Sequence, residues 1–308
     1  MRVFVTGAAG WVGSAVTKEL IQHGHKVLGL ARSVEPAEKI TKVGGEVLRG
    51  DLEDLESLKK GAQETDGTLH LAFIHDFTNM KHATAVDRAA ISALAEVVAG
   101  TGKPLIITSG SLIVANLGGA VATEETDIDR SVPWIDRWKS EDLILSLSKE
   151  KDVKGMVVRL TPTVHGDGDK GFVPGLIGSA RKNGAAIYVG DGSARWPAVH
   201  RYDAAVLYRL ALEKGKAGAI YHAAAEQGIA QKDIEGLIGK VLNLPVESKS
   251  LEEALPKLGF FAHVTSMDKP LSSEKTQTEL GWKPKELGLL ADMEAHYFKE
   301  SAQSKYQF

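Results

Sequence analysis

The sequence contains no cysteine, no long apolar run and no excess of one charge. Without cysteine, disulfide bonds, thiolate metal sites and a cysteine nucleophile are excluded, which suits a reducing compartment. No apolar stretch approaches the roughly 18 residues of a membrane-spanning helix, and residues 1–10 lack a signal-peptide pattern. The net charge of −3 is scattered along the chain, unlike a nucleic-acid-binding surface. We expect a soluble cytoplasmic protein with a small-molecule partner.

Two further absences concern catalytic centres. No pair of histidines has metal-ligand spacing together with a carboxylate, and no G-x-S-x-G sequence is present. We therefore expect neither a metal site nor a serine hydrolase.

Short runs rich in Val, Ile and Leu alternate with helical patterns along the first half of the chain. This alternation predicts parallel strands covered by helices on both faces. The expected strands are 3–7, 26–32, 46–51, 68–73, 104–109, 155–160 and 219–224, and the first helices are 12–23, 35–43 and 84–100. We place the main domain at 1–164 with 201–224 returning to it, and a smaller lobe at 165–200 and 225–308. Such a lobe would close over the carboxyl ends of the strands.

A glycine-rich segment, TGAAGWVG at 6–13, directly follows the first expected strand and opens the first expected helix. Gly7 permits a tight turn, Gly10 lets the backbone approach a pyrophosphate, and Gly13 lets the helix pack closely. The free amides at the start of the helix attract a diphosphate. A tight turn without a ligand is the alternative. The motif predicts a dinucleotide site formed by Gly7, Ala9, Gly10, Trp11 and Val12.

The end of the second expected strand carries Arg32 and Ser33, where NAD-selective folds place an acid. Arg32 could stack on adenine and pair with a 2′-phosphate, and Ser33 could donate a hydrogen bond, so NADP(H) is favoured. An ordinary surface arginine is the alternative. Asp51 and Leu52, after the third strand, would lie beside the adenine, although Asp51 could also cap a helix.

The glycine segment, GD at 50–51, HLA at 70–72, TSGS at 108–111, RLTPTVHG at 159–166 and LGWKP at 280–284 resemble the extended short-chain dehydrogenase/reductase superfamily, whose members are also called NAD-dependent epimerase/dehydratase-like. The resemblance implies an α/β Rossmann-type fold, a doubly wound parallel sheet with a smaller C-terminal substrate-binding lobe. It assigns cofactor contacts to Ala72, Phe73, Ser109, Thr161 and Pro162, and the active-site serine or threonine place to Ser109 or Ser111.

The chain departs from this superfamily at the usual catalytic tyrosine and the lysine four residues later. Glu141 matches a glutamate usually found beyond the lysine, which puts Arg137 in the lysine place and Pro133 in the tyrosine place. None of the six tyrosines has a lysine four residues later, as in atypical subgroups of the superfamily. Because guanidinium holds its protons above a pKa of roughly 12, Arg137 can position cofactor or substrate but cannot donate a proton. Ser111 or Ser109 could relay a proton instead.

Other side chains have both a functional and a structural interpretation. Four side chains could each be a proton donor that faces the substrate or an ordinary loop residue: His75, Asp76, His165 and Asp167. Arg195 and His200 resemble residues that grip a substrate phosphate, although Arg195 could equally form a salt bridge. Trp134, Trp138 and Trp196 could line an apolar pocket or serve packing, and Asp203 is expected to be a helix N-cap.

Three functions fit these observations. We favour an NADPH-dependent oxidoreductase acting on a small, partly apolar carbonyl, imine or activated alkene, because iminium and enone substrates need little acid help. The alternatives are a nucleotide-sugar epimerase or dehydratase and a non-catalytic NADP(H) sensor. The helices expected at 84–100 and 137–149 carry apolar stripes that could pair two subunits into a homodimer or be buried within one.

Overall fold

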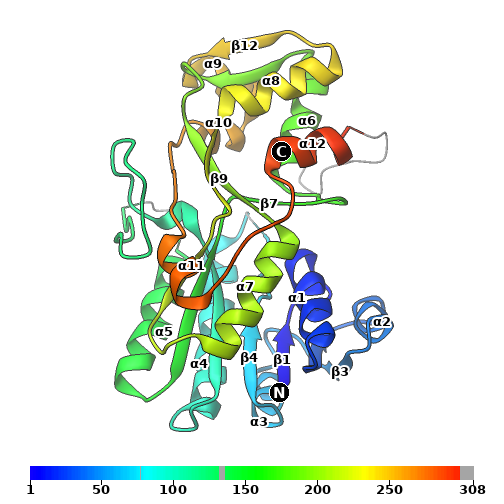
Figure 1. The fold of residues 1–308 in the computed structure, drawn as a ribbon, viewed down its shortest axis with the longest axis vertical. Coiled ribbons are helices and arrows are strands. Elements are labelled where there is room, and N and C mark those ends of the chain that lie inside the picture. The colour runs from blue at the N-terminus through cyan, green and yellow to red at the C-terminus, as the bar shows by residue number, and fades with distance from the viewer. Residues whose placement is uncertain (77, 132–135, 299–308) are drawn as a thin grey trace.

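The computed structural model describes residues 1–76, 78–131 and 136–298. Its largest part is a seven-stranded sheet in the order β10-β6-β5-β4-β1-β2-β3, and every neighbouring pair is parallel (Figure 1). The strands are β1 (Arg2–Thr6), β2 (Lys26–Ala31), β3 (Glu46–Arg49), β4 (Gly67–His70), β5 (Pro104–Gly110), β6 (Lys154–Leu160) and β10 (Ile220–Ala223). The doubly wound Rossmann-type sheet is confirmed, and strand order reverses between β1 and β4, where such sheets bind ligands.

Helices cover both faces of the sheet, which explains why its central strands are apolar along their whole length. Val3 and Val5 of β1 face the helices α1 (Trp11–Gln22), α2 (Val34–Lys42) and α7 (Arg201–Lys214). Phe4, which points the opposite way, faces α3 (Leu55–Gln63), α4 (Met80–Val98) and α5 (Trp138–Glu150). The alternation of side chains along one strand thus supplies two separate cores.

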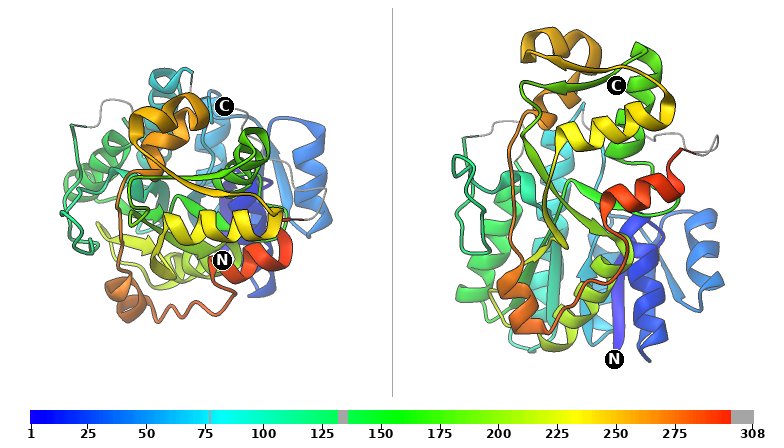
Figure 2. Two further views of the ribbon diagram at one scale, coloured as in Figure 1. Left: turned by 90° about the horizontal axis from the view of Figure 1, so that it is seen from above. Right: turned by 45° about the horizontal axis from the view of Figure 1, so that its top comes forward.

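A smaller lobe lies over the carboxyl ends of the strands, as Figure 2 shows from two directions. A three-stranded sheet, β11-β9-β7, leads into it, and β8 pairs with β12 inside it. Its strands are β7 (Thr163–His165), β8 (Ala186–Val189), β9 (Arg195–His200), β11 (Glu226–Ala230) and β12 (Val246–Lys249). Its helices are α6 (Phe172–Asn183), α8 (Gln231–Leu242), α9 (Leu251–Leu258), α10 (Phe260–Thr265) and α12 (Leu289–His296).

One segment of the expected lobe belongs to the main domain instead. α11 (Glu274–Leu280) packs on α7 and β10, and Leu280 and Trp282 lie in the same core cluster as α1 and α7. Trp282 Nε1 donates to the Asp203 carbonyl at 2.9 Å. The boundary that assigns 225–308 wholly to the lobe is therefore wrong for this stretch, because a buried indole anchors it to the core.

The expected helix cap at Asp203 is also wrong. The N-cap of α7 is His200, whose Nδ1 accepts the Tyr202 amide at 3.3 Å. The Asp203 carboxylate instead accepts the amides of Lys285 and Glu286, each at 3.0 Å. Asp203 thus fixes the chain that returns from α11 to the lobe.

Two other kinds of feature are absent from residues 1–76, 78–131 and 136–298. No described helix has the length and apolar character needed to cross a membrane. Across the same residues, no group of three or more His, Asp or Glu side chains is arranged to hold a metal ion.

Candidate cofactor and substrate site

The glycine segment forms a tight loop between β1 and α1. Gly7 has a φ of +69°, and a Cβ on it would lie 2.8 Å from the Ala72 amide nitrogen. A Cβ on Gly13 would lie 2.0 Å from the Gly7 carbonyl oxygen. Only glycine fits at either position without moving the backbone, so Gly7 makes the turn and Gly13 allows close packing, as the motif predicts.

The start of α1 is open to an anion. Its N-cap, Gly10, offers no side-chain cap, and no acidic residue lies in its first turn. The first amides of any helix have no intrahelical acceptor, and the helix dipole adds partial positive charge there. The Trp11 indole turns away, since Nε1 donates to the Val164 carbonyl at 2.8 Å and the ring stacks against Arg201 at 4.2 Å. The backbone of Trp11, and not its indole, therefore faces the place for a diphosphate.

The residues expected to select the cofactor lie after β2 and β3. Arg32 is exposed and has no ion-pair partner in the part of the chain that the structure describes, while Ser33 begins α2 without a side-chain capping bond. Asp51 Oδ1 accepts the amides of Glu53 and Asp54 at 2.9 and 3.0 Å. Since the N-cap of α3 is Asp54, the interpretation of Asp51 as a helix cap is wrong. Asp51 closes a turn after β3 and is exposed.

Arg137 is fixed at the carboxyl ends of β4 and β5. Its guanidinium lies 4.1 Å over the Phe73 ring, and Nη2 donates to the Thr108 carbonyl at 2.8 Å. Its Nε is buried without a hydrogen-bond partner among the described residues. The structure thus brings Phe73 and Arg137 together where the cofactor is expected. Pro133 and Trp134 lie outside the described residues.

Two serine hydroxyls at the end of β5 are buried and unpaired. Ser109 and Ser111 are each 2% exposed, and neither Oγ has a hydrogen-bond partner among residues 1–76, 78–131 and 136–298. Ser111 opens the short helix η1 (Ser111–Ile113). Buried hydroxyls are nearly always paired, because an unpaired one loses its bonds to water without replacement. Together with Arg137 Nε, the two serine oxygens are three of the buried polar atoms that have no partner among the described residues.

Thr161 and Pro162 follow β6, directly beside the serines in the sheet. Gly110 of β5 is in register with Leu160 of β6, so the two chain segments leave the sheet side by side. Thr161 Oγ1 donates to the Thr163 carbonyl at 3.0 Å, which fixes the turn into β7. The expected nicotinamide border and the two serines therefore share one edge.

A buried polar chain lies beneath Arg137. Thr6 Oγ1 accepts the Ala72 amide at 3.1 Å and lies 2.9 Å from His70 Nδ1, and His70 Nε2 lies 3.3 Å from Asp87 Oδ1. Ser140 Oγ donates to Asp87 Oδ2 at 2.6 Å. Burial opposes ionisation of Asp87, but His70, Arg137 and Ser140 hold its pKa below the ordinary value.

This chain of contacts joins Thr6, at the start of the glycine loop, to α4 and α5, where the charge of Arg137 also acts on Asp87. Thr6 and His70 lie in motifs visible in the sequence, TGAAGWVG and HLA. Asp87 and Ser140 lie on separate helices and had no recognisable signal.

Glu141, which marks the register of the missing pair, is a structural residue. It is fully buried, and Arg159 Nη2 donates to its Oε2 at 2.8 Å. Arg159 Nη1 also contacts His222 Nε2 at 3.3 Å, while His222 Nδ1 lies 2.8 Å from the Ser272 carbonyl. Burial and the charge of Arg159 lower the pKa of His222 to about 3, so His222 stays neutral. The ion pair ties α5 to β6.

Most of the lobe candidates turn out to be structural. Arg195 Nη2 and Nε donate to Asp268 Oδ2 and Oδ1 at 2.8 and 2.9 Å, so the salt bridge is the interpretation that the structure shows. Trp196 is fully buried in the core of the lobe and donates from Nε1 to the Val264 carbonyl at 3.1 Å, so it serves packing. Trp138, on α5, lies near the cations of Arg130 and Lys139.

The four candidate proton donors have different surroundings, some buried and some exposed. His165 is buried with Nδ1 2.8 Å from Asp292 Oδ2, and its ring lies 5.3 Å from that of His200. Asp167 is exposed in a turn, as the glycine-rich pattern indicates. His75 is exposed and packs edge-on against Phe73 at 5.5 Å, while Asp76 accepts from Thr78. His75 thus contacts the same Phe73 ring as Arg137 does.

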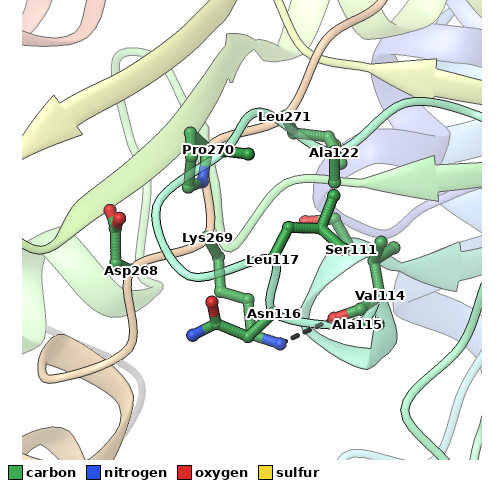
Figure 3. Close-up of a pocket in the computed structure, with 11 residues that line it drawn as sticks. Ser111, Val114, Ala115, Asn116, Leu117, Ala122, Asp268, Lys269, Pro270 and Leu271 are labelled. Atoms are coloured by element: carbon green, nitrogen blue, oxygen red, sulfur yellow. Dashed lines mark hydrogen bonds between the residues drawn. The ribbon is translucent and has the colours of Figure 1, made fainter. Parts of the chain in front are cut away.

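A small pocket adjoins η1 between the main domain and the segment 268–271, which Figure 3 shows in close-up. Ser111 lines it from the main domain and Lys269 from the other side. Lys269 is 9% exposed, and its Nζ donates to the Val114 carbonyl at 2.6 Å. No sequence pattern drew attention to Lys269, because it follows an irregular stretch far along the chain from Ser111.

Comparison with known proteins gives the same fold and a consistent set of relatives. A family model described as the NAD dependent epimerase/dehydratase family matches residues 3–228. The chain is 48% identical over 299 residues to the uncharacterized protein YLL056C of Saccharomyces cerevisiae, covering 96% of this chain and 99% of that protein. It is 25% identical to 4-hydroxy-2-methyl-3-oxo-4-farnesyl-3,4-dihydroquinoline-1-oxide ketoreductase of Stigmatella aurantiaca, over 92% of each chain.

Among solved structures, the dTDP-glucose 4,6-dehydratase DesIV from Streptomyces venezuelae superposes with a TM-score of 0.77 at 17% identity, covering 95% of this chain and 94% of that one. That structure contains NAD and TYD. At this level of identity, the similarity establishes the fold alone.

Proposed function

Because the chain belongs to the NAD dependent epimerase/dehydratase family, we propose that it is an NADPH-dependent oxidoreductase that reduces a small, partly apolar carbonyl, imine or activated alkene. The observation that carries the proposal is the group of buried, unpaired polar atoms, Ser109 Oγ, Ser111 Oγ and Arg137 Nε, beside an uncapped phosphate loop. The relative from Stigmatella aurantiaca that is named a ketoreductase supports the same reaction class.

The residues at the carboxyl edge of the sheet fit a dinucleotide. Backbone at Gly7, Ala9, Gly10, Trp11 and Val12 would hold the diphosphate, since the loop is tight enough to exclude any Cβ at Gly7. Arg32 and Ser33 would hold the 2′-phosphate, Asp51 and Leu52 the adenine, and the remaining contacts would come from Ala72, Phe73, Thr161 and Pro162. When bound, NADPH supplies a hydride, which is the reducing power of the proposed reaction.

The protein's own contribution is to orient the substrate and stabilise charge. Arg137, held by Phe73 and Thr108, presents a fixed cation that can steady a developing oxyanion. It donates no proton, because guanidinium stays charged. The Ser111 or Ser109 hydroxyl can pass a proton from water to the substrate oxygen. A substrate that is already polarised, such as an iminium or an enone, would need less of this help.

The test is a substrate panel with purified protein. NADPH binding is measured by calorimetry, and NADPH oxidation is followed by absorbance with small ketones, iminium ions and enones. We expect turnover with at least one class and none with Arg137→Met. Tight NADPH binding with no turnover across the panel would count against a reductase and favour the NADP(H) sensor.

A nucleotide-sugar epimerase or dehydratase is the second candidate, favoured by the fold shared with DesIV. The locked Arg195 side chain weighs against it, because Asp268 and the Gly119 carbonyl already occupy its donors. Tightly retained NAD and sugar-dependent turnover would favour it over reduction.

A homodimer through α4 and α5 remains a proposal. α5 buries only Ser140, Glu141 and Ile144 fully, so Leu143 and Leu147 on it are partly exposed. Sedimentation of the protein tests this, and a monomer across the concentration range would rule it out.

A further inference from the structure

A second arginine without a partner lies beside Arg32. Arg49 is the last residue of β3 and is exposed, and its guanidinium forms no hydrogen bond or ion pair with any residue in the described part of the chain. The same holds for Arg32, directly after β2. Several arginines elsewhere are held by carboxylates, and they include Arg2, Arg130, Arg159, Arg195 and Arg209. The ends of β2 and β3 therefore carry two cations that have no counter-ion among the described residues.

The register of the sheet brings these two arginines together. Arg49 pairs with Ala31, the residue before Arg32, and the Gly50 amide donates to the Ala31 carbonyl at 3.4 Å. Because neighbouring strands lie about 4.8 Å apart and one residue advances about 3.3 Å along a strand, the Cα atoms of Arg32 and Arg49 lie roughly 6 Å apart. Two side chains as long as arginine can therefore meet on one group.

Arg49 extends on the face of the sheet that α2 covers. Side chains alternate along a strand, so Arg49 lies on the same face as Val47, which packs against the core cluster that contains Ile40 of α2. α2 begins directly after Arg32 and Ser33, and it lies beside β3 at one side of the molecule (Figure 1). Arg49 thus shares a face with the helix whose first residues follow the expected 2′-phosphate site.

The acids at this edge of the sheet are already engaged. Glu35, in the first turn of α2, pairs with Lys39 at 2.7 Å. Asp51 Oδ1 accepts two backbone amides, and Asp54 caps α3. None of the three acids pairs with either arginine. Two neighbouring cations repel each other, and an anion held between them replaces that repulsion with attraction.

A phosphate monoester matches two guanidinium groups. It carries a charge of about −1.5 to −2 at neutral pH and has three acceptor oxygens. Each arginine can donate two parallel hydrogen bonds to such a group. NADP(H) has a phosphate on the 2′-oxygen of its adenosine ribose, where NAD(H) has only a hydroxyl. The ribose of a dinucleotide is expected at the end of β2, close to the end of β3.

We propose that Arg49 and Arg32 together bind the 2′-phosphate of NADP(H), so that Arg49 is a second residue that selects this cofactor. This inference rests on the cofactor part of the proposed function and does not depend on the reaction or the substrate. Gly50 helps to fix Arg49, because a Cβ at Gly50 would lie 2.1 Å from Ser57 Oγ, so β3 ends in close contact with α3.

The experiment compares NADP⁺ with NAD⁺, which lacks only the 2′-phosphate. Calorimetry measures both cofactors on the full chain without substrate. Two charge-assisted contacts of about 10-fold or more each predict that the wild type binds NADP⁺ about 100-fold or more tightly than NAD⁺. Arg49→Ala should weaken NADP⁺ binding by about 10- to 100-fold and leave NAD⁺ binding unchanged.

Further variants separate this role from a general effect of charge. Arg49→Lys should lose less than Arg49→Ala, because an ammonium group keeps the charge but not the two parallel donors. The double variant Arg32→Ala/Arg49→Ala should bind the two cofactors alike. Arg181→Ala removes an exposed arginine of α6 and should leave the preference intact. Adenosine 2′,5′-bisphosphate, compared with AMP, should show the same dependence on Arg49.

Several outcomes overturn the proposal. An intact preference for NADP⁺ in Arg49→Ala, or equal weakening of both cofactors, would each do so. An equal loss in Arg181→Ala would attribute the effect to general surface charge. Arg49-dependent binding of inorganic phosphate with a cofactor preference independent of Arg49 would assign a free anion instead. If Arg49→Ala does not fold, Arg49→Gln, which removes the charge and keeps much of the side-chain length, takes its place with the same expected loss.

The two proposals fail in distinguishable ways. An Arg49-dependent preference for NADP⁺ without turnover on any substrate would refute the oxidoreductase and keep the assignment of Arg49. Turnover with a preference for NADPH over NADH that does not depend on Arg49 would refute only the assignment of Arg49.

Discussion

Gly13→Ala is the sharpest test of the phosphate loop. A Cβ at this position would lie 2.0 Å from the Gly7 carbonyl oxygen, whereas ordinary contact begins at 3.4 Å, so the loop must move by at least 3.4 − 2.0 = 1.4 Å. Overpacking of this kind typically costs about 1–3 kcal/mol of stability. Losing one hydrogen bond between a loop amide and the charged diphosphate costs about 1.5–3 kcal/mol, on the order of 10- to 100-fold in affinity. We therefore expect NADPH affinity to fall by about 10- to 100-fold, up to roughly 2.7 kcal/mol, in calorimetry.

The matched control is Gly178→Ala. Gly178 lies in α6 (Phe172–Asn183), and a Cβ there would meet no atom within 4 Å. The same substitution should stabilise the protein by up to about 1 kcal/mol in thermal unfolding, through helix propensity, and leave NADPH binding unchanged. If Gly13→Ala bound NADPH as the wild type does, the glycine loop would not be the diphosphate cradle, and the reasoning from Gly7 and Gly13 would fail.

Three further predictions concern single side chains. Arg32→Ala should weaken NADPH binding about 10- to 100-fold and leave NADH binding unchanged in calorimetry, and an unaltered preference for NADPH would contradict this selectivity. Arg137→Met should lower kcat/KM on an accepted substrate by about 10²- to 10³-fold, because it removes a preorganised cation, and equal turnover would refute that role. Burial raises the pKa of Glu235 from its ordinary 4.5 to about 8, so the wild type loses stability as pH rises through this window. The Tm of Glu235→Gln minus the Tm of the wild type should therefore increase between about pH 5 and about pH 9. If this Tm difference stayed constant over that range, Glu235 would not be a buried, protonated carboxyl in the folded protein.

The parts of the site that could be predicted from sequence are those made by neighbouring residues. The glycine segment identified the loop and its strand and helix, because Gly7 and Gly13 meet local backbone constraints within eight residues. Arg32 could likewise be predicted from its position directly after β2. Ser109 and Ser111 were singled out by the resemblance of TSGS to the superfamily, and the structure shows both hydroxyls buried and unpaired among the described residues.

The interpretations that failed concern single residues with several structural uses. For Trp196 a pocket wall and packing were both open, and it packs the lobe core, whereas Asp203 was expected to be a helix cap but fixes a returning chain. Nothing in the sequence distinguished these alternatives, because an indole or a carboxylate satisfies either role equally well until its surroundings are known.

Sequence alone determined the parallel α/β sheet, the glycine loop after its first strand and the absence of a Tyr-x-x-x-Lys pair, since each depends on short-range periodicity or spacing. Only the tertiary structure decided which charges are free. It paired Arg195 with Asp268, buried Asp87 with His70, and bonded the buried Lys269 to the Val114 carbonyl with no acid within ion-pair distance among the described residues. These outcomes depend on distances between elements far apart in the chain, because the energy of a charge is set by burial and by the nearest opposite charge, neither of which a linear pattern records.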